Sequence, residues 1–521
     1  MYKKIFISVI GLLFVAGMLT GGCSDNAMTT ATKTPSIAGP QYDGILRIGT
    51  QTIPKNNIGW PTEASQVSES DMVFLTCNRL LSTDSKGTPL PELAKSWKIA
   101  DDGKSITFSL RDDVKFHDGS QFDAAAAKWN MDYWLGAHMP GLDRITSIEV
   151  VDTCTLKVNI TEYINTILVN LASFRFGFVS PAAFKKNGLE WMRNNPVGTG
   201  PFKLVSWKPE VSSRFVRFDD YWGGRPYLDE IRYTYLPDAM TGLLMMLHGE
   251  LDVFMESDVT AQSGLQQKGF AVAPPMTGGG MAILCPSAAD LSSPFADRRV
   301  REALEYAIDK ESLVWLGLGN WQPLYQFATR NSIGYNSEIT ARKYDPIKAK
   351  QLLAEAGYPD GIKTKYNVTV GAIPQDVAIA VQRYLNEAGF KCTMKSLTFA
   401  AGTDMMFHGW DGIFFCGVNP DMDYLQRAER YVSANSVMYP SILRPAALQP
   451  LVDEALTARA SEGKTAAAKQ IVKFVYDQSL IIPLYETGGE QIIATYVQDS
   501  GFGVRGQTFW DPAKCWIKTN K

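Results

Sequence analysis

The sequence predicts an α/β protein with more than one domain. Helix-like and strand-like segments are mixed from about residue 45 to residue 500, and they follow no repeat period. One segment fits a β–α–β unit, with strands over 366–370 and 390–394 around a helix over 375–388. Such a unit implies parallel strand pairing. The chain has 521 residues, which is room for about two to four domains of the usual size.

The N-terminus predicts an export signal over residues 1–22. Two lysines precede an uncharged, largely apolar run over residues 5–19, which is shorter than the roughly 20 residues that a membrane-spanning helix needs. The segment resembles a bacterial lipoprotein signal, in which Cys23 becomes the first mature residue and carries lipid, although Thr20 stands where leucine is usual. We therefore expect an extracytoplasmic protein, in the periplasm or on the outer cell surface, with a lipid anchor in a membrane.

Residues 23–42 are predicted to form a flexible tether, because they are rich in small and polar residues. Six cysteines follow, none of them in a Cys-x-x-Cys pair, at positions 77, 154, 285, 392, 416 and 515. Most have apolar neighbours, so we expect them to be small core residues. An exported chain permits disulfides, so one cross-link stays open.

The folded part is expected to begin with a strand over 45–48. Two strand pairs follow, over 96–110 and 148–160, each with a polar turn inside it. Between them, Asp123 is expected to cap a helix that runs to about Leu135.

Two more helices are predicted farther along the chain. In segment 297–314, apolar residues recur at helical spacing and form one stripe, made of Val300, Ala303, Leu304, Ala307 and Ile308. Asp345 is expected to cap the next helix, with Pro346 in its first turn and Gly357 at its end.

An uncharged strand over 412–418 ends abruptly in turn-forming residues. Asn419, Pro420, Asp421 and Asp423 follow it and place oxygen acceptors beyond the edge of the sheet. Ligands bind at the carboxyl ends of strands in open α/β sheets, so this stretch is the first candidate for a binding site. A core strand followed by an ordinary loop is the alternative.

Six stretches carry a family resemblance and follow one another in the family's order. They are LPELAKSWKIADDGKSITFSLRDDVKFHDGSQFDA (90–124), PVGTGPFKLVSW (196–207), FDDYWGGRPYLDEI (218–231), HGELD (248–252), DRRVREALEYAID (297–309) and YDPIKAKQLLAEAGYPDG (344–361). The chain resembles the extracytoplasmic solute-binding proteins of family 5, the peptide and nickel class, which serve ABC importers.

The resemblance implies a two-lobed periplasmic-binding-protein fold of type II, in the class with an enlarged first lobe. Lobe I would comprise residues 43–276 and 484–521, and lobe II residues 277–483. Two chain crossings, near Thr277 and Pro483, would act as a hinge whose closure buries the ligand. A monomer is expected.

The resemblance also points to two positions on the central strand. In peptide-binding members, this strand carries an aromatic residue and then an aspartate that pairs with the α-ammonium of the ligand. Phe415 and Val418 stand at these positions, so the aspartate is missing. A buried ammonium without a counter-charge costs several kcal/mol, which is orders of magnitude in affinity. Either Asp421 or Asp423 replaces the aspartate, or the ligand has no free amino terminus.

Other ligand-binding candidates follow from their position in the family. They are Thr50, Gln51, Thr52 and Ile53 after the first strand, Cys416, Gly417 and Asn419 in or after the central strand, and Tyr485 near the second crossing. His408, Trp410 and Arg427 lie near the central strand, but a structural role is expected for each.

The resemblance favours a substrate-binding lipoprotein that captures a dipeptide, an oligopeptide or a similar small polar solute and delivers it to an ABC permease. A nickel chelate, a sugar-like solute or a signalling peptide stays open. Direct metal binding would depend on Cys416, Asp421 and Asp423, whose spacing is loose, and no cofactor is expected.

A secreted enzyme is the second alternative. The chain contains neither H-E-x-x-H nor G-x-S-x-G, and its four histidines are widely separated, so no catalytic residue is proposed. With 51 basic and 54 acidic residues, the net charge of −3 argues against nucleic acid as a partner.

Overall fold

The computed structural model describes residues 39–54, 57–64, 67–84, 86–255, 259–273, 280–418, 423–489, 491–502 and 510–518. The predicted export signal, Cys23 and most of the predicted tether lie outside the described residues and stay predictions. Within the described ranges, no helix is both long enough and apolar enough to cross a membrane. Pro40–Lys521 forms one compact unit, which holds every element below.

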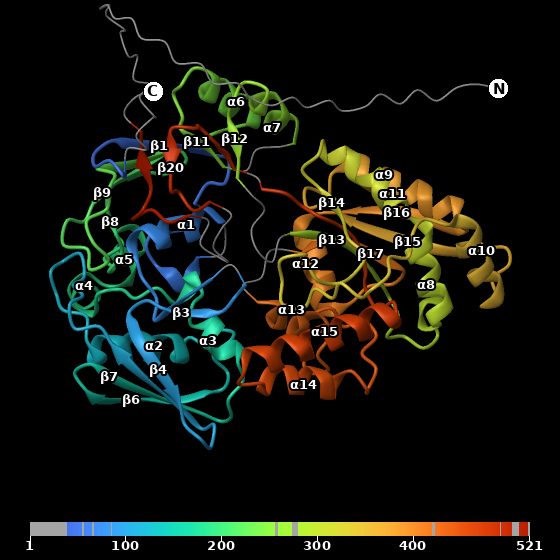
Figure 1. The fold of residues 1–521 in the computed structure, drawn as a ribbon, viewed down its shortest axis with the longest axis horizontal. Helices are drawn as coiled ribbons and strands as arrows, with labels where there is room; N and C mark the ends of the chain where they lie inside the picture. The colour runs from blue at the N-terminus through green and yellow to red at the C-terminus, as the bar shows by residue number, and fades with distance from the viewer. Residues whose placement is uncertain are drawn as a thin grey trace, which may run out of the picture. The chain divides into compact units, whose positions relative to one another are not determined.

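A seven-stranded sheet contains the first strand of the chain (Figure 1). Its members are β1 (Ile45–Thr50), β8 (Phe202–Lys208), β9 (Ser212–Arg217), β10 (Glu230–Tyr235), β11 (Val253–Phe254), β12 (Ala271–Val272) and β19 (Ile492–Ile493). They lie in the order β12-β19-β11-β1-β10-β9-β8. β1 pairs in parallel with β10 and β11, and the other neighbours run antiparallel. β1 therefore confirms the first predicted strand and continues past it to Thr50.

A four-stranded antiparallel sheet confirms both predicted strand pairs. It consists of β4 (Ala94–Ile99), β5 (Ser105–Leu110), β6 (Ile145–Asp152) and β7 (Thr155–Ile160), in the order β4-β5-β7-β6. The helix α2 (Ala124–Gly136) packs against β6 and β7. The carboxylate of Asp123 caps this helix as predicted, by accepting a hydrogen bond of 2.8 Å from the backbone N–H of Ala126.

A six-stranded sheet contains the predicted β–α–β unit and the central strand. Its members are β13 (Met281–Pro286), β14 (Gln322–Pro323), β15 (Ile362–Thr369), β16 (Phe390–Leu397), β17 (Ile413–Val418) and β18 (Ile482–Glu486), in the order β14-β18-β13-β17-β15-β16. β15 pairs in parallel with β16 and with β17, and α11 (Gln375–Glu387) connects β15 to β16. The parallel pairing predicted from the sequence is therefore confirmed.

The chain passes between the two larger sheets twice. It leaves β12 at Val272 and enters β13 at Met281, and residues 274–279, with the predicted crossing at Thr277, lie outside the described residues. It passes back between the end of β18 and the start of β19, so β18 continues beyond the predicted crossing at Pro483 to Glu486. The exact lobe boundaries stay predictions.

The helix predicted over segment 297–314 is interrupted. α8 (Arg298–Ala307) ends where Ile308 adopts an extended conformation, and α9 (Lys310–Leu313) begins after it. Asp309 accounts for the break, because its carboxylate accepts a hydrogen bond of 3.0 Å from the N–H of Ser312 and so caps a new helix. All five residues of the predicted apolar stripe are nevertheless buried.

The helix predicted to begin after Asp345 is confirmed. It is α10 (Pro346–Glu355), and Asp345 accepts a hydrogen bond of 2.9 Å from the N–H of Lys348. The remaining helices of four or more residues are α1 (Val67–Thr76), α3 (Thr166–Asn170), α4 (Pro181–Asn187), α5 (Leu189–Asn194), α6 (Ala239–Leu247), α7 (Val259–Gln266), η4 (Val314–Gly317), α12 (Phe399–His408), α13 (Tyr424–Tyr431), α14 (Gln449–Thr457) and α15 (Ser461–Asp477).

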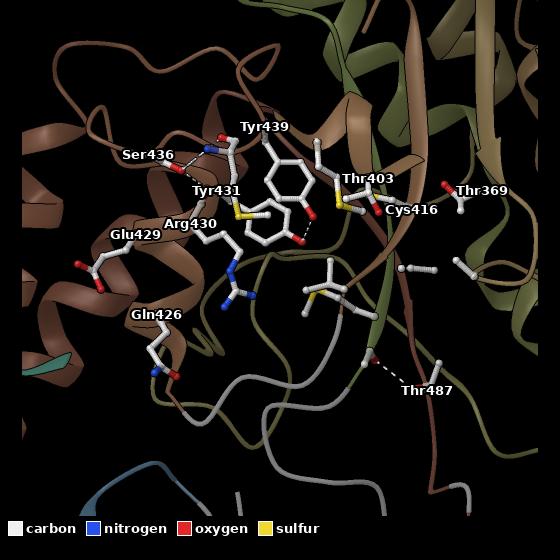
Figure 2. Close-up of a pocket in the computed structure, with 18 of the residues that line it drawn as sticks. Thr369, Thr403, Cys416, Gln426, Glu429, Arg430, Tyr431, Ser436, Tyr439 and Thr487 are labelled. Atoms are coloured by element: carbon white, nitrogen blue, oxygen red, sulfur yellow. Dashed lines mark hydrogen bonds between the residues drawn. The ribbon is translucent and has the colours of Figure 1, made fainter. Parts of the chain in front are cut away.

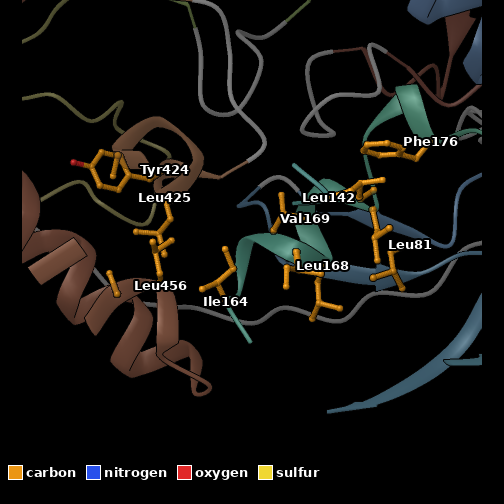
Figure 3. Close-up of a cluster of buried hydrophobic side chains, with 14 of the residues drawn as sticks. Leu81, Leu142, Ile164, Leu168, Val169, Phe176, Tyr424, Leu425 and Leu456 are labelled. Atoms are coloured by element: carbon orange, nitrogen blue, oxygen red, sulfur yellow. The ribbon is translucent and has the colours of Figure 1, made fainter. Parts of the chain in front are cut away.

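The largest hydrophobic cluster joins the four-stranded sheet to the C-terminal helices. In Figure 3, Leu425 and Leu456 lie across from Ile164 and Leu168 within this cluster. The Asn165 side chain adds a hydrogen bond of 2.6 Å to the carbonyl oxygen of Ala455 in α14. Segments far apart in the sequence are therefore held together by both apolar and polar contacts.

Most of the cysteines are core residues, as predicted. The side chains of five are buried, at positions 77, 285, 392, 416 and 515, and Cys154 is partly exposed. All six are free thiols in the described part of the chain.

Candidate functional site

A cavity of about 2370 Å³ lies beside the six-stranded sheet (Figure 2). Most of its lining comes from the edge of that sheet, from helices α11, α12, α13 and α14, and from the segment of residues 138–176. A typical small-molecule pocket encloses roughly 300–1,000 Å³. The cavity therefore has room for a solute larger than a single amino acid.

The sheet edge at the cavity is made of carboxyl ends, as the sequence predicted. Thr369 ends β15 and Val418 ends β17, and both residues line the cavity. β13 runs antiparallel to both β17 and β18, so β18 runs parallel to β17 and brings Tyr485 to the same edge. Met281 enters this edge from the opposite direction, at the start of β13.

Four of the predicted ligand-binding residues line the cavity. They are Cys416, Gly417, Val418 and Tyr485. The Tyr485 ring stacks on Trp321 with 4.4 Å between ring centroids, and burial raises the pKa of its phenol, so the side chain stays neutral. A contact between any of these residues and a solute stays a prediction.

Phe415 lies on the opposite face of β17 from the cavity-lining Cys416. Its side chain is fully buried and stacks on Tyr366 with 6.1 Å between ring centroids. Phe415 is absent from the described cavity lining, although Gly417, which lies on the same face of β17, belongs to it. Phe415 therefore packs in the core, and the geometry does not support a ligand-binding role for it.

The residues predicted after the first strand do not line the cavity. Thr50 is buried at the end of β1, where its hydroxyl accepts a hydrogen bond of 3.1 Å from the N–H of Thr52. Ile53 packs against the hydrophobic cluster of the seven-stranded sheet. Neither these three residues nor Gln51 belongs to the cavity lining among the described residues, so their ligand role stays a prediction without geometric support.

The carboxylate of Asp423 makes its contacts within the protein itself. Its carboxylate accepts a hydrogen bond of 3.0 Å from the N–H of Leu425, which caps α13, and it forms an ion pair with Lys464. The carboxylate is inaccessible to solvent and is absent from the described lining. Asn419 and Asp421 lie outside the described residues. The replacement of the missing aspartate by Asp423 is therefore not supported by the geometry.

The three neighbours of the central strand are placed as structural residues. Trp410 is buried, and its indole N–H donates a hydrogen bond of 2.9 Å to the carbonyl oxygen of Cys285. Arg427 is buried with its guanidinium over the ring of Phe327, and His408 is exposed beside Asp404. None of the three lines the cavity in the part of the chain that the structure describes.

A pair of stacked tyrosines was not identified from the sequence. Tyr431 of α13 and Tyr439 stack with 4.1 Å between ring centroids, and the Tyr431 hydroxyl donates a hydrogen bond of 2.9 Å to that of Tyr439 (Figure 2). Burial raises the pKa of both phenols, so both remain neutral hydrogen-bonding groups. α13 ends at Tyr431 and Tyr439 lies beyond it, so no single helix pattern contains both residues.

Sulfur-containing side chains are frequent in the cavity wall. Besides Cys416 they are Met281, Met394, Met406 and Met438. Methionine side chains are flexible and polarizable, and they adapt to apolar ligand groups of different shapes. This part of the wall is suited to apolar portions of a solute.

Charged residues line the cavity away from the sheet edge. They are Asp143, Arg144, Glu162 and Arg175 in the segment 138–176, and Asp376, Glu429, Arg430 and Asp453 on the side of the helices. Arg144 forms an ion pair with Glu162. Burial raises the pKa of Glu429, and Figure 2 shows Arg430 extending from α13 toward the cavity.

The described residues contain no group of three or more His, Cys, Asp or Glu side chains arranged to hold a metal ion. The loosely spaced metal ligands considered from the sequence include Asp421, which lies outside the described residues. A metal bound directly by Cys416 and Asp423 is therefore not supported by the geometry.

Known proteins with similar sequences are binding proteins. Heme-binding protein A of Haemophilus influenzae is 32% identical over 339 residues, which cover 56% of this chain and 58% of that protein. Glutathione-binding protein GsiB of Salmonella paratyphi A is 30% identical over 345 residues, which cover 61% of this chain and 65% of that protein. The matches thus span less than two thirds of the length of these relatives.

Solved structures with the same fold match almost the whole chain. HbpA2 from Haemophilus parasuis superimposes with a TM-score of 0.81 at 21% identity, covering 91% of this chain and 100% of that one. DppA from Helicobacter pylori, in complex with the peptide STSA, has a TM-score of 0.76 at 21% identity, covering 92% and 99%. These matches confirm the predicted two-lobed α/β fold of periplasmic binding proteins.

The sequence also matches a family description directly. Residues 88–425, which are more than half of the chain, match the family called bacterial extracellular solute-binding proteins, family 5. The resemblance seen in the six sequence stretches is thereby confirmed: the chain belongs to the bacterial extracellular solute-binding proteins of family 5.

Proposed function

We propose that this protein captures a small solute in the cavity beside the six-stranded sheet and delivers it to the permease of an ABC importer. The cavity supports this proposal, because strand ends, helices and loops enclose a volume of about 2370 Å³. Membership of family 5 supports the transport role. Capture and delivery require no chemical change in the solute, so we propose no catalytic activity.

A peptide, or a small solute like a peptide, is the ligand that we propose. Structural neighbours include DppA bound to the peptide STSA and a dipeptide-binding protein bound to Met-Leu. Glutathione, named for one of the sequence relatives, is a further candidate. The described strand residues at the cavity carry no charged side chain, so no strand residue offers a carboxylate to the α-ammonium of the solute. Asp376 of α11, which lines the cavity near Tyr485, is the nearby carboxylate.

We further propose export and lipid anchoring through Cys23, with the folded part acting as a monomer outside the cytoplasm. The basic start, the apolar run and the small residues before Cys23 support this proposal. Mass spectrometry of the mature N-terminus would test it, because a lipid-modified Cys23 is expected in the wild type and should disappear in Cys23→Ser. An unmodified N-terminus in both proteins would contradict lipidation.

A thermal-shift screen of the purified mature protein would test the ligand class. Its panel would contain Met-Leu, STSA, glutathione, N-acetylated peptides, nickel chelates and simple sugars. A ligand that binds the folded state raises the unfolding temperature by mass action, and we expect this for at least one peptide or glutathione. Stabilisation only by a chelate or a sugar would contradict the peptide class.

Native mass spectrometry would separate capture from catalysis. A solute retained by the purified protein should be released unchanged on denaturation. Recovery of a hydrolysed or otherwise altered solute after incubation would contradict a pure binding role.

A further inference from the structure

We propose that Arg175 binds a carboxylate of the solute, so that the protein selects solutes by an acidic group. This inference rests on the proposed function and adds a substrate class to it. Arg175 lies in the short 3-10 helix η2 (Phe174–Phe176) and lines the cavity.

Arg175 has no anionic partner among the described residues. None of the ion pairs and side-chain hydrogen bonds of the described chain involves its guanidinium, whereas Arg144 on the same segment is paired with Glu162. The contact that does involve it is with the neighbouring Phe174 ring, whose centroid lies 5.9 Å from the guanidinium carbon. The guanidinium therefore keeps its hydrogen-bond donors for another group.

The surroundings of Arg175 favour such a group. Its side chain is partly buried, and burial lowers the pKa of the guanidinium, with a further contribution in the same direction from the positive charge of Arg430. A partly desolvated cation beside a second cation is destabilised relative to water. An anion in the cavity offsets both effects, because it supplies hydrogen bonds and an opposite charge.

The backbone that carries Arg175 is fixed on both sides. The N–H of Phe176 donates a hydrogen bond of 3.0 Å to the carbonyl oxygen of Ser173, and the Phe176 side chain is buried. The N–H of Phe178 donates one of 2.9 Å to the carbonyl oxygen of Asn78. A guanidinium on such a turn loses little backbone freedom when it binds.

A contact with α13 explains how Arg430 comes close to this turn. The side-chain amide of Gln426 donates a hydrogen bond of 2.7 Å to the side-chain oxygen of Asn170. Gln426 and Arg430 are four residues apart on α13 and therefore share a face of the helix. This face brings Arg430 near enough to Arg175 to contribute to the lowered pKa of its guanidinium.

Carboxylate is the anion that best fits this arrangement and the proposed ligand class. A guanidinium presents parallel N–H donors that match the two oxygens of a carboxylate. A peptide always offers one at its C-terminus, and acidic side chains offer others. The solute would thus be recognised through an acidic group on one side of the cavity and through neutral groups on the other.

Isothermal titration with paired peptides tests the inference. The probes are the tetrapeptide STSA, its C-terminal amide, and glutathione. We expect the free acid to bind the wild type about tenfold more tightly than the amide. Arg175→Gln should weaken binding of the acid by about the same factor and leave the amide unchanged. Arg175→Lys, which keeps the charge but not the fork of donors, should give an intermediate affinity.

Arg383→Gln serves as the matched control, because Arg383 is an exposed arginine on α11 outside the cavity lining. It should bind like the wild type. Unfolding temperatures within about 2 °C of the wild type would show that the variants fold.

The outcomes separate the two proposals. Equal binding of acid and amide, with no effect of Arg175→Gln, would overturn the carboxylate inference and leave peptide capture intact. An equal loss for acid and amide would overturn it as well. If no peptide and no glutathione bind, peptide capture is wrong. The carboxylate inference is then tested with the dicarboxylate glutarate and its neutral diamide, glutaramide. Glutarate must raise the unfolding temperature of the wild type more than glutaramide does, and this difference must disappear in Arg175→Gln.

A selective loss for glutathione but not for STSA would assign Arg175 to one of the two carboxylates of that tripeptide. A selective loss for STSA would assign it to a peptide C-terminus. Both results support recognition of a carboxylate.

Discussion

The two walls of the cavity differ in the kind of recognition that they allow. The neutral wall comprises the edge of the six-stranded sheet, with Met281, Cys416, Val418 and Tyr485, and the stacked pair of Tyr431 and Tyr439 beside Cys416. The segment 138–176 presents charged side chains. The first wall rests on strands paired along their length, whereas the lining residues of the second lie on loops and short helices outside β6 and β7. The difference indicates that the sheet edge defines the shape of the solute and the opposite segment its charge.

The neutral wall has a consequence for ligand polarity. Removing a charged group from water without a partner is costly, so a free α-ammonium gains nothing at Val418. A carboxylate gains an arginine on the other wall. The two walls together favour solutes that are bound through an acidic end, and each of the following variants changes one wall or its support.

Asp423→Ala should have the largest effect, on stability. The variant removes a buried carboxylate that caps α13 and pairs with Lys464. Breaking a buried ion pair costs about 3–5 kcal/mol of unfolding free energy, which urea denaturation would measure. Asp423→Asn can still cap the helix, so its loss should be smaller.

The exposed pair of Asp404 and His408 provides the control for Asp423. Asp404→Ala should change the unfolding free energy by less than about 0.5 kcal/mol. An Asp423→Ala protein of unchanged stability but reduced affinity for peptides would restore Asp423 as a ligand group and contradict the structural role.

Gly417→Leu should have the next largest effect, on binding. A Cβ atom at Gly417 would meet only the backbone oxygen of Ala372, at 3.5 Å, which is an ordinary contact. A leucine side chain would therefore fit the backbone and occupy the cavity at the sheet edge. We expect the affinity for the best peptide of the screen to fall about 100-fold, or roughly 2.7 kcal/mol, with little change in unfolding temperature.

Gly417→Ala is the matched control, because it adds one methyl group at the same position. Its affinity should change by less than about threefold. Wild-type affinity in Gly417→Leu would show that the solute does not reach this edge. It would contradict the interpretation that the sheet edge defines the shape of the solute.

Regular elements of the sheets could be predicted from the sequence, because short-range patterns determine them. The β–α–β unit, the two strand pairs and the cap at Asp123 follow from alternation, helical spacing and turn residues. The interruption at Ile308 could not be predicted from spacing alone, because the apolar stripe continues through it and only the cap at Asp309 ends the helix.

The neutral wall was easier to predict than the charged one. Cys416, Gly417 and Val418 are consecutive, so recognising one strand located all three. Arg175 lies in a short 3-10 helix, and its position beside Arg430 depends on packing between segments more than 200 residues apart in the chain. No local pattern contains that information. The stacked tyrosines were missed for another reason, because Tyr439 lies beyond the end of α13 at Tyr431.

Val418→Asp would test whether the neutral wall excludes an amino terminus. The residue lines the cavity at the end of β17 and is 3% exposed. A carboxylate there should raise the affinity for free-amino peptides about tenfold and leave N-acetylated peptides unchanged. Titration of both peptide forms would measure the difference. Val418→Asn, which adds polarity without charge, is the control; equal changes for both forms in Val418→Asp would contradict the interpretation of this position.

Tyr439→Phe should have the smallest effect, because it alters the neutral wall without changing its shape. The variant removes the hydroxyl that accepts the hydrogen bond of 2.9 Å from Tyr431. Losing one such bond costs about 1 kcal/mol of unfolding free energy. Urea denaturation of both single variants and the double variant Tyr431→Phe/Tyr439→Phe would isolate the interaction, since the two losses should not add if the hydroxyls depend on each other.

Affinity for an acidic solute should stay within about threefold of the wild type in Tyr439→Phe, because charge is recognised on the other wall. A much larger loss of affinity would mean that the tyrosine hydroxyls bind the solute directly, and the neutral wall would then contribute polar recognition as well as shape.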